Sequence, residues 1–163
     1  MESSQKILID GYNLIHADHD MKRLIGASPD SARSLLLDRL RTYVRTKCLQ
    51  ITVVFDGRGS MLDTEPVVPG KLQILFSRER QSADDLIIAI LEEAANAREY
   101  LVVTSDNEDI GRVARGLGAQ VIDSPSFLKR IARTRPSFPA RKEKPAPADD
   151  DLEYWLRKFS KEE

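Results

Sequence analysis

Short apolar runs rich in β-branched residues alternate with segments of helical periodicity, and this alternation constrains the fold more than any other feature. The runs cover residues 6–9, 51–55, 72–76, 100–104 and 119–122. The helical segments cover residues 31–47, 82–96, 107–115 and 126–133. Strands that alternate with helices are typical of a parallel sheet covered on both faces. We therefore predict a three-layer α/β fold with a mainly parallel sheet, whose strands take the order 3-2-1-4-5.

Two connecting segments are polar or rich in turn-forming residues. The segment after the first strand is interpreted as a loop, and it contains His16, Asp18, His19 and Asp20. Residues 58–70 contain glycines and prolines and are interpreted as a second loop. Histidines and aspartates so close together could bind a metal ion, but loop histidines more often have no ligand.

The C-terminal part differs in composition from the rest. Residues 134–148 contain four prolines and predict a basic linker without a core-forming pattern. In residues 149–163 an apolar stripe of helical spacing is formed by Leu152, Trp155, Leu156 and Phe159. Such a stripe has to be buried, either on the body of this chain or on a partner. We predict one domain at residues 1–133, a linker at 134–148 and an amphipathic helix at 149–163.

Composition narrows the class of protein. With 163 residues, 41% hydrophobic and 31% charged, the chain has the size and composition of one water-soluble domain. No apolar run approaches the length of a membrane span, and the polar residues 1–6 do not resemble a secretory signal. The single cysteine, Cys48, excludes an internal disulfide and a cysteine-based zinc site, and we expect it to be buried or half-buried. We predict a cytoplasmic protein without membrane contact and leave its oligomeric state open.

The net charge is −1, but the basic residues are unevenly distributed along the chain. Between residues 129 and 144, seven basic residues face one acidic residue, Glu143. Three of them, Lys129, Arg130 and Arg133, belong to the last predicted helix of the body. One-sided positive charge attracts nucleic acid by Coulombic attraction and counterion release. A solvated tail without a partner would have the same composition.

Carboxylates end strands or begin helices at four places. These are Asp10, Asp56, the pair Asp84 and Asp85, and Asp106 with Asp109. Each one alone has a structural explanation as a turn residue or a helix cap. Jointly they point to a site, because the carboxyl ends of parallel strands share one edge of the sheet, where ligands bind. Asp10 and Asp106 end strands that we expect to be neighbours, and Asp84 approaches from the adjacent helix.

Converging carboxylates imply a cation. Their mutual repulsion either raises a pKa or requires a positive ion. Oxygen ligands without His or Cys favour Mg²⁺ or Mn²⁺, and such an ion can activate water against a phosphodiester. A haloacid-dehalogenase-type phosphatase is disfavoured, because Tyr12 stands where its second aspartate is needed. A phospho-acceptor receiver is disfavoured because the acidic pair opens a later helix. The pattern predicts metal-dependent phosphoryl chemistry.

Four segments resemble the motifs of a known family. They are residues 7–13 (ILIDGYN), 53–56 (VVFD), 82–85 (SADD) and 102–106 (VVTSD). In order and spacing they resemble the YacP-like NYN-domain proteins of the PIN-like nuclease group, over about residues 6–133. The resemblance implies RNA cleavage with Mg²⁺ or Mn²⁺ held by three catalytic residues, Asp10, Asp84 and Asp106. It also implies supporting positions for Asn13, Asp56, Asp85 and Asp109.

Other residues near this edge are candidates for RNA contact. Tyr12 could stack on a base, or it could pack in the core. Arg78 and Arg80 lie between the third strand and Asp84, where they could reach backbone phosphates or remain solvated charges. With the basic residues of the last helix, these side chains predict RNA as the partner.

The function that follows is a metal-dependent endoribonuclease that hydrolyses single-stranded RNA, such as messenger RNA, and leaves 5′-phosphates. Some relatives cut messenger RNA on the ribosome, so the resemblance also implies mRNA decay linked to the ribosome. The alternative is a non-catalytic RNA- or ribosome-binding module on the same fold.

Overall fold

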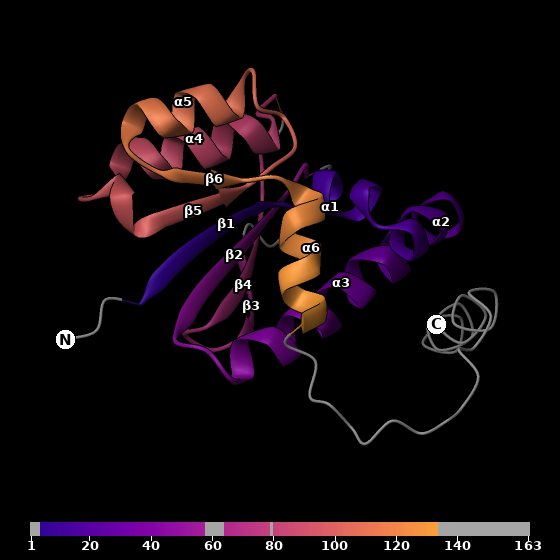
Figure 1. Ribbon diagram of the computed structural model, residues 1–163. Helices are drawn as coiled ribbons and strands as arrows, with labels where there is room; N and C mark the ends of the chain where they lie inside the picture. Colours follow the sequence, from indigo (N-terminus) through magenta and orange to yellow (C-terminus); the bar gives the residue numbers. More distant parts are fainter. Residues whose placement is uncertain (1–3, 58–63, 79, 134–163) are drawn as a thin grey trace.

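The computed structural model describes residues 4–57, 64–78 and 80–133, and all statements below concern these ranges (Figure 1). The strands are β1 (Gln5–Asp10), β2 (Leu49–Phe55), β3 (Thr64–Val68), β4 (Leu72–Phe76), β5 (Tyr100–Val103) and β6 (Gln120–Ile122). The helices are α1 (Gly11–Ala17), α2 (His19–Ala27), α3 (Pro29–Arg45), α4 (Ala83–Glu93), α5 (Ile110–Leu117) and α6 (Ser124–Arg133), with a 3-10 turn, η1 (Ala97–Glu99).

The sheet has the order β3-β4-β2-β1-β5-β6. β1 pairs in parallel with β2 and β5, and the outer pairs β2–β4 and β5–β6 are parallel as well. The five strands expected from the sequence therefore take the predicted order 3-2-1-4-5, and the predicted fold class is confirmed. In this register Ile9 lies beside both Val53 and Val103, so these strands end at the same edge.

Two helical layers cover the two faces of the sheet (Figure 1). Along β1, Ile7 and Ile9 point to the face covered by α1, α2, α3 and α6, whereas Leu8 points to the face covered by α4 and α5. All three side chains are at most 1% exposed. A central strand buried on both faces is expected to be continuously apolar, as this one is.

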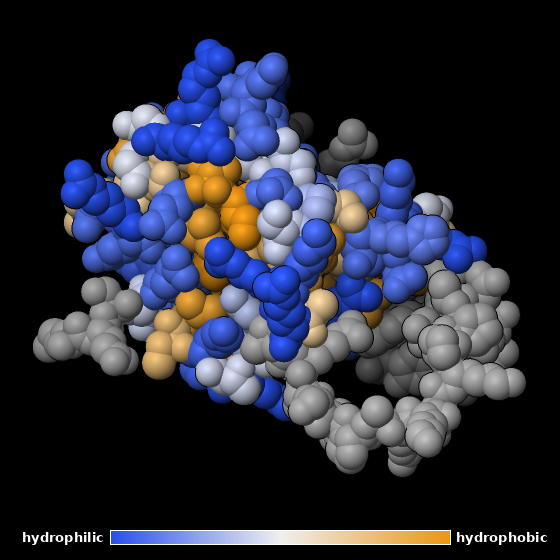
Figure 2. All heavy atoms as spheres, in the orientation of Figure 1, coloured by the Kyte–Doolittle hydropathy of each residue, from blue (hydrophilic) through white to orange (hydrophobic). Residues whose placement is uncertain are grey.

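The α6 side of the molecule is less completely covered. In Figure 2, apolar side chains gather beside α6, over β1, β5 and β6, while hydrophilic side chains surround them. The half-buried Ile122 and Leu128 pack against the core on this side. β6 is the last strand of the sheet on this side.

The segment between β1 and α3 is helical, so its interpretation as a loop was wrong. Asp18 caps α2 by accepting a hydrogen bond from the backbone N–H of Met21 at 3.0 Å. The two short helices bury Leu14, Ile15 and Leu24. Their polar residues form the exposed faces of helices that are too short for a strong periodic signal.

Two further predictions about the connections were wrong. Within the predicted loop at residues 58–70, residues 64–68 form β3, an antiparallel edge strand on β4 with a register shift near Pro66. Prolines are confined to edges and bulges in sheets, which is why this strand looks like a loop in the sequence. Cys48 is exposed in the turn before β2 rather than buried.

The helix boundaries follow local capping. Ser28 is the N-cap of α3, and its Oγ accepts from the N–H of Ser31; Gly118, with a φ of 106°, is the C-cap of α5. None of the described helices combines the length and apolar composition needed to cross a membrane. The predicted linker at 134–148 and terminal helix at 149–163 lie outside the described residues.

Candidate active site

Asp10 lies where β1 turns directly into α1. Its Oδ1 accepts a hydrogen bond from the backbone N–H of Asn13 at 3.3 Å, so Asp10 is the N-cap of α1. The following residue has to be glycine, because a Cβ on Gly11 would overlap the ring of Phe55. This close packing fixes the Asp10 carboxyl group at the carboxyl edge of the sheet.

Asp84 comes to the same edge from the first turn of α4. The helix begins with a capping box: Ser82 Oγ accepts from the N–H of Asp85 at 3.0 Å, and Asp85 Oδ2 accepts from the N–H of Ser82 at 3.1 Å. This confirms the cap-like helix start expected from the sequence. Asp85 is part of this cap. The hydrogen bond from the Ser82 N–H lowers the pKa of its exposed carboxylate.

Asp56 holds the start of α4 against the end of β2. Its Oδ1 accepts from the backbone N–H of Ala83 at 2.6 Å and from Ser77 Oγ at 3.5 Å. Ser77 Oγ in turn accepts from the N–H of Gly57 at 3.2 Å. Asp56 is therefore a positioning residue for Asp84. Ser77, which is 4% exposed, was not singled out in the sequence, where a serine after a strand gives no signal.

Asp10 and Asp84 form the electrostatic centre of the site. The pKa of Asp10 is raised from 3.8 to about 7, chiefly by burial, and the neighbouring carboxyl groups of Asp84 and Asp56 contribute to this rise. The N–H of Asn13 acts in the opposite direction. Burial also raises the pKa of Asp84, with contributions from Asp106 and Asp56. The two side chains are close enough to share a hydrogen bond, so near neutral pH this pair holds a proton or a cation.

Asp106 follows β5 at the border of this pair, and its charge raises the pKa of Asp84. The N–H of Asp106 donates to Thr104 Oγ1 at 3.1 Å, and its Oδ1 accepts from the N–H of Asp109 at 3.1 Å. One carboxylate oxygen thus closes the turn before α5. Asp109 is exposed and caps α5 without a side-chain hydrogen bond.

Asn13 joins three elements at this edge. Its Oδ1 accepts from the N–H of Ser105 at 2.9 Å and from Ser124 Oγ at 2.6 Å. Ser124 is fully buried, and its N–H donates to Ser105 Oγ at 3.3 Å. Because a backbone N–H can only donate, the amide orientation of Asn13 is unambiguous. Ser105 and Ser124 were missed in the sequence, since nothing there connects two serines with an asparagine so far away along the chain.

The donor set fits a divalent cation with an incomplete protein shell. Within the described ranges, no three His, Cys, Asp or Glu residues lie close enough together to hold a metal ion. Asp10 and Asp84 nevertheless offer paired carboxyl groups whose main charged neighbours are other carboxylates. Mg²⁺ is commonly bound by one or two carboxylates plus waters and substrate phosphates. The pair fits this kind of ion better than it fits zinc.

The remaining candidates for RNA contact differ in their exposure and packing. The ring of Tyr12 packs edge-on against Phe55 at a centroid distance of 5.1 Å, which agrees with its packing interpretation. Arg78 and Arg80 are exposed just before α4, beside the site. The basic residues of α6 are exposed as well, and they are Lys129, Arg130 and Arg133.

The segment from His16 to Asp20 forms an ion pair with α3. Asp18 binds Arg39 of α3 at 2.8 Å, and Asp20 lies 3.7 Å from the same guanidinium. His16 and His19 are exposed. Arg39 therefore supplies the positive charge beside these two aspartates.

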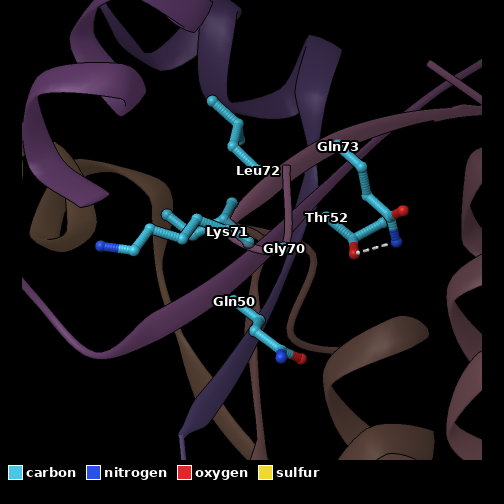
Figure 3. Close-up of a pocket in the computed structure, with 7 residues that line it drawn as sticks. Gln50, Thr52, Gly70, Lys71, Leu72 and Gln73 are labelled. Carbon is cyan, nitrogen blue, oxygen red and sulfur yellow. Dashed lines mark hydrogen bonds between the residues drawn. The ribbon is translucent and has the colours of Figure 1, made fainter. Parts of the chain in front are cut away.

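A hollow of about 170 Å³ lies far from this edge, near the beginnings of β2 and β4 (Figure 3). Its polar side chains include Gln50, Thr52 and Gln73, and Gln73 Nε2 donates to Thr52 Oγ1 at 3.1 Å. None of the residues lining it is acidic. This hollow therefore offers no carboxylate to a cation.

Comparison with known proteins agrees with this fold. The sequence matches the family described as YacP-like NYN domain over residues 7–162. The uncharacterized protein YacP of Bacillus subtilis (strain 168) is 29% identical over 101 residues, which are 61% of this chain and 59% of that protein. The match thus spans about three fifths of that relative's length.

Solved structures share the architecture. The crystal structure of a point mutant of Rae1 (YacP) from Bacillus subtilis has a TM-score of 0.65 and 23% identity, covering 97% of this chain and 85% of that one. A second crystal structure of Rae1 (YacP) has a TM-score of 0.61 and 23% identity, covering 96% of this chain and 82% of that one. This likeness shows a common fold.

Proposed function

Because the chain belongs to the YacP-like NYN domain family, part of the PIN-like nuclease superfamily, we propose that it is a metal-dependent endoribonuclease acting on single-stranded RNA. The observation that carries the proposal is the pairing of Asp10 with Asp84, both with raised pKa values and with carboxylates as their main charged neighbours. A fold needs no such pair for stability, since like charges at close range destabilise it.

Asp10 and Asp84 would hold Mg²⁺ or Mn²⁺, with Asp106 as a further carboxylate at the border. A bound cation of this kind neutralises charge on the phosphodiester and makes a water molecule more acidic. The Asp10–Asp84 pair gives up its shared proton when a cation binds. Asp56 keeps Asp84 in place through the Ala83 N–H.

Asn13 has a separate role in this proposal. Its Oδ1 already accepts two hydrogen bonds, so the oxygen that would bind a metal is engaged within the protein. The amide nitrogen keeps its donors for a phosphate oxygen. Hydrolysis would leave a 5′-phosphate and a 3′-hydroxyl. By the family resemblance, messenger RNA is the substrate, cut in association with the ribosome in the cytoplasm.

Cleavage of an internally unstructured RNA, labelled at both ends, in Mn²⁺ tests the proposal. Asp10→Asn should reduce the cleavage rate at least about a thousandfold while RNA binding is retained, because the loss concerns transition-state stabilisation. Asp38→Asn is the matched control, since Asp38 makes only a surface ion pair with Arg41 on α3. Its rate should stay at the wild-type value.

Full cleavage by Asp10→Asn would refute the catalytic role of the pair. A wild-type protein that binds RNA but does not cut it with Mg²⁺ or Mn²⁺ would favour the alternative, a non-catalytic RNA- or ribosome-binding module. The observation that supports this alternative is that, within the described residues, no three His, Cys, Asp or Glu side chains are grouped closely enough to hold a metal ion.

A further inference from the structure

The flank of α4 contains a hollow of about 470 Å³. Arg78 and Arg80 line it before the helix begins, and Leu86, Ile90 and Glu93 line it along the helix. Leu86 comes two residues after Asp84, so the hollow and the proposed active site lie on opposite sides of the start of α4. Its volume is in the range that ligand pockets usually have.

The turn that carries the two arginines has a defined geometry. Gln81 closes it twice: its N–H donates to the carbonyl oxygen of Arg78 at 2.9 Å, and its Oε1 accepts from the N–H of Arg78 at 3.4 Å. Arg80 has a φ of 68°, which is uncommon for a residue other than glycine. Such a conformation persists only where the surroundings over-determine it, and it is frequent at ligand sites. The arginines are therefore placed by the fold.

The lining contains three kinds of side chain, in order from the turn before α4 to the end of the helix. Arg78 and Arg80 are exposed cations suited to phosphate. Leu86 and Ile90 are half-buried and give an apolar wall, and Glu93 is an exposed carboxylate that can accept from an amino group. Phosphate, flat apolar ring and exocyclic amine are the parts of one nucleotide. Charge complementarity favours a polyanion as the occupant.

We propose that this hollow binds one nucleotide of a single-stranded RNA that crosses the start of α4, away from the nucleotide that is cut. Arg78 and Arg80 bind the backbone phosphates, and the base lies against Leu86 and Ile90. The identity of the ligand rests on the proposed nuclease function. The site itself is separate from the acidic pair and binds RNA without a divalent cation.

Binding of a fluorescent, unstructured RNA of about twelve nucleotides to the full chain, in EDTA so that nothing is cut, measures the phosphate contacts. Arg78→Ala and Arg80→Ala should each raise Kd about tenfold and reduce the slope of log Kd against log salt by about one. Arg45→Ala, which removes an exposed arginine at the far end of α3, should leave both unchanged. Arg80→Gly should weaken binding as much as Arg80→Ala, although glycine tolerates the backbone conformation better.

A second variant tests the base. Ala89→Trp fills the hollow from the half-buried Ala89 of α4. Wild type should bind RNA more tightly than an abasic ribose-phosphate strand of the same length, because base contacts add to phosphate contacts. Ala89→Trp should remove this difference while binding the abasic strand like wild type. Equal weakening of both strands would show that no base enters the hollow.

The outcomes separate the subsite from the catalytic proposal. Wild-type Kd and salt dependence in both arginine variants, with cleavage still abolished by Asp10→Asn, would overturn the subsite and leave the nuclease intact. A wild-type protein that neither binds nor cuts RNA would overturn both. Weaker binding in Arg78→Ala and Arg80→Ala, in a protein that does not cut RNA, would support the subsite and refute the nuclease.

Discussion

Two acidic clusters near the N-terminus are built from the same residue type and have opposite electrostatics. Asp10 meets Asp84, and burial together with neighbouring carboxylates raises both pKa values. Asp18 and Asp20 instead face Arg39, which lies 2.8 and 3.7 Å away. Within the described residues, one cluster is paired with an arginine, whereas the main charged neighbours of the other are further carboxylates. The position of the nearest arginine therefore says more about function than the number of aspartates does.

The largest expected effect is on cleavage. Asp84→Asn should lower the single-turnover rate at least about a thousandfold, which is about 4 kcal/mol of transition-state stabilisation. Asp18→Asn, the same change in the neutralised cluster, should stay within about threefold of wild type. Equal losses in the two variants would mean that both clusters act through stability alone.

The second effect concerns folding. Arg39→Met should lower the free energy of unfolding by about 2–3 kcal/mol, because it leaves Asp18 partly buried without its partner. Urea unfolding measures this, and the double variant with Asp18→Asn should recover part of the loss. A change below about 0.5 kcal/mol would show that the ion pair contributes no more than a surface pair does.

The third effect is a gain in the free energy of unfolding, caused by a substitution at Asp10. The folded protein binds a proton on Asp10 more tightly than the unfolded chain, since the pKa is about 7 instead of 3.8. Ionising Asp10 therefore destabilises the fold: the contribution of Asp10 to stability is complete below about pH 4 and is lost as the pH rises to about 7. Asp10→Asn should stabilise the metal-free protein by about 2 kcal/mol near pH 8, about half of the full linkage value because the side chain is only partly buried.

Thermal or urea unfolding at several pH values in EDTA checks this. The wild-type and Asp10→Asn curves should converge at acidic pH and separate above neutrality. Parallel curves would show that Asp10 ionises in the fold as it does in water.

The smallest effect concerns Asp56, which holds the start of α4 against the end of β2. Asp56→Ala should lower stability by about 1–2 kcal/mol, because it removes the acceptor for the Ala83 N–H. Asp56→Asn keeps an oxygen acceptor and should retain most of the stability. If Asp56 only positions Asp84, Asp56→Asn should also keep most of the cleavage rate; a loss as large as that of Asp84→Asn would make it a metal ligand.

Much of the fold was predictable from local patterns. The apolar runs located β1, β2, β4, β5 and β6, and the helices between them indicated parallel crossovers and hence the strand order. The Ser82–Asp85 capping box was visible for the same local reason. β3 was missed because Pro66 is a strong loop signal, and α1 and α2 were missed because each presents only about two turns to the core.

The gathering of aspartates at one edge was predictable, whereas their hydrogen bonds were not. Topology places Asp10, Asp56 and Asp106 directly after strands whose carboxyl ends share that edge. The tethering of Ala83 by Asp56, and the joining of Ser105 to Ser124 by Asn13, depend on tertiary contacts that no local pattern encodes. The neutralisation of Asp18 by Arg39 likewise needed the packing of α2 on α3.

Calorimetric titration of the metal-free protein with Mn²⁺, in two buffers of different ionisation enthalpy, tests most directly whether the acidic pair is a cation site. Wild type should bind Mn²⁺ and release up to about one proton near pH 6.5, and fewer as the pH rises above the pKa of Asp10. Asp10→Asn should bind much more weakly and release none. Absence of binding to wild type, or equal affinity and proton release in both proteins, would contradict the account.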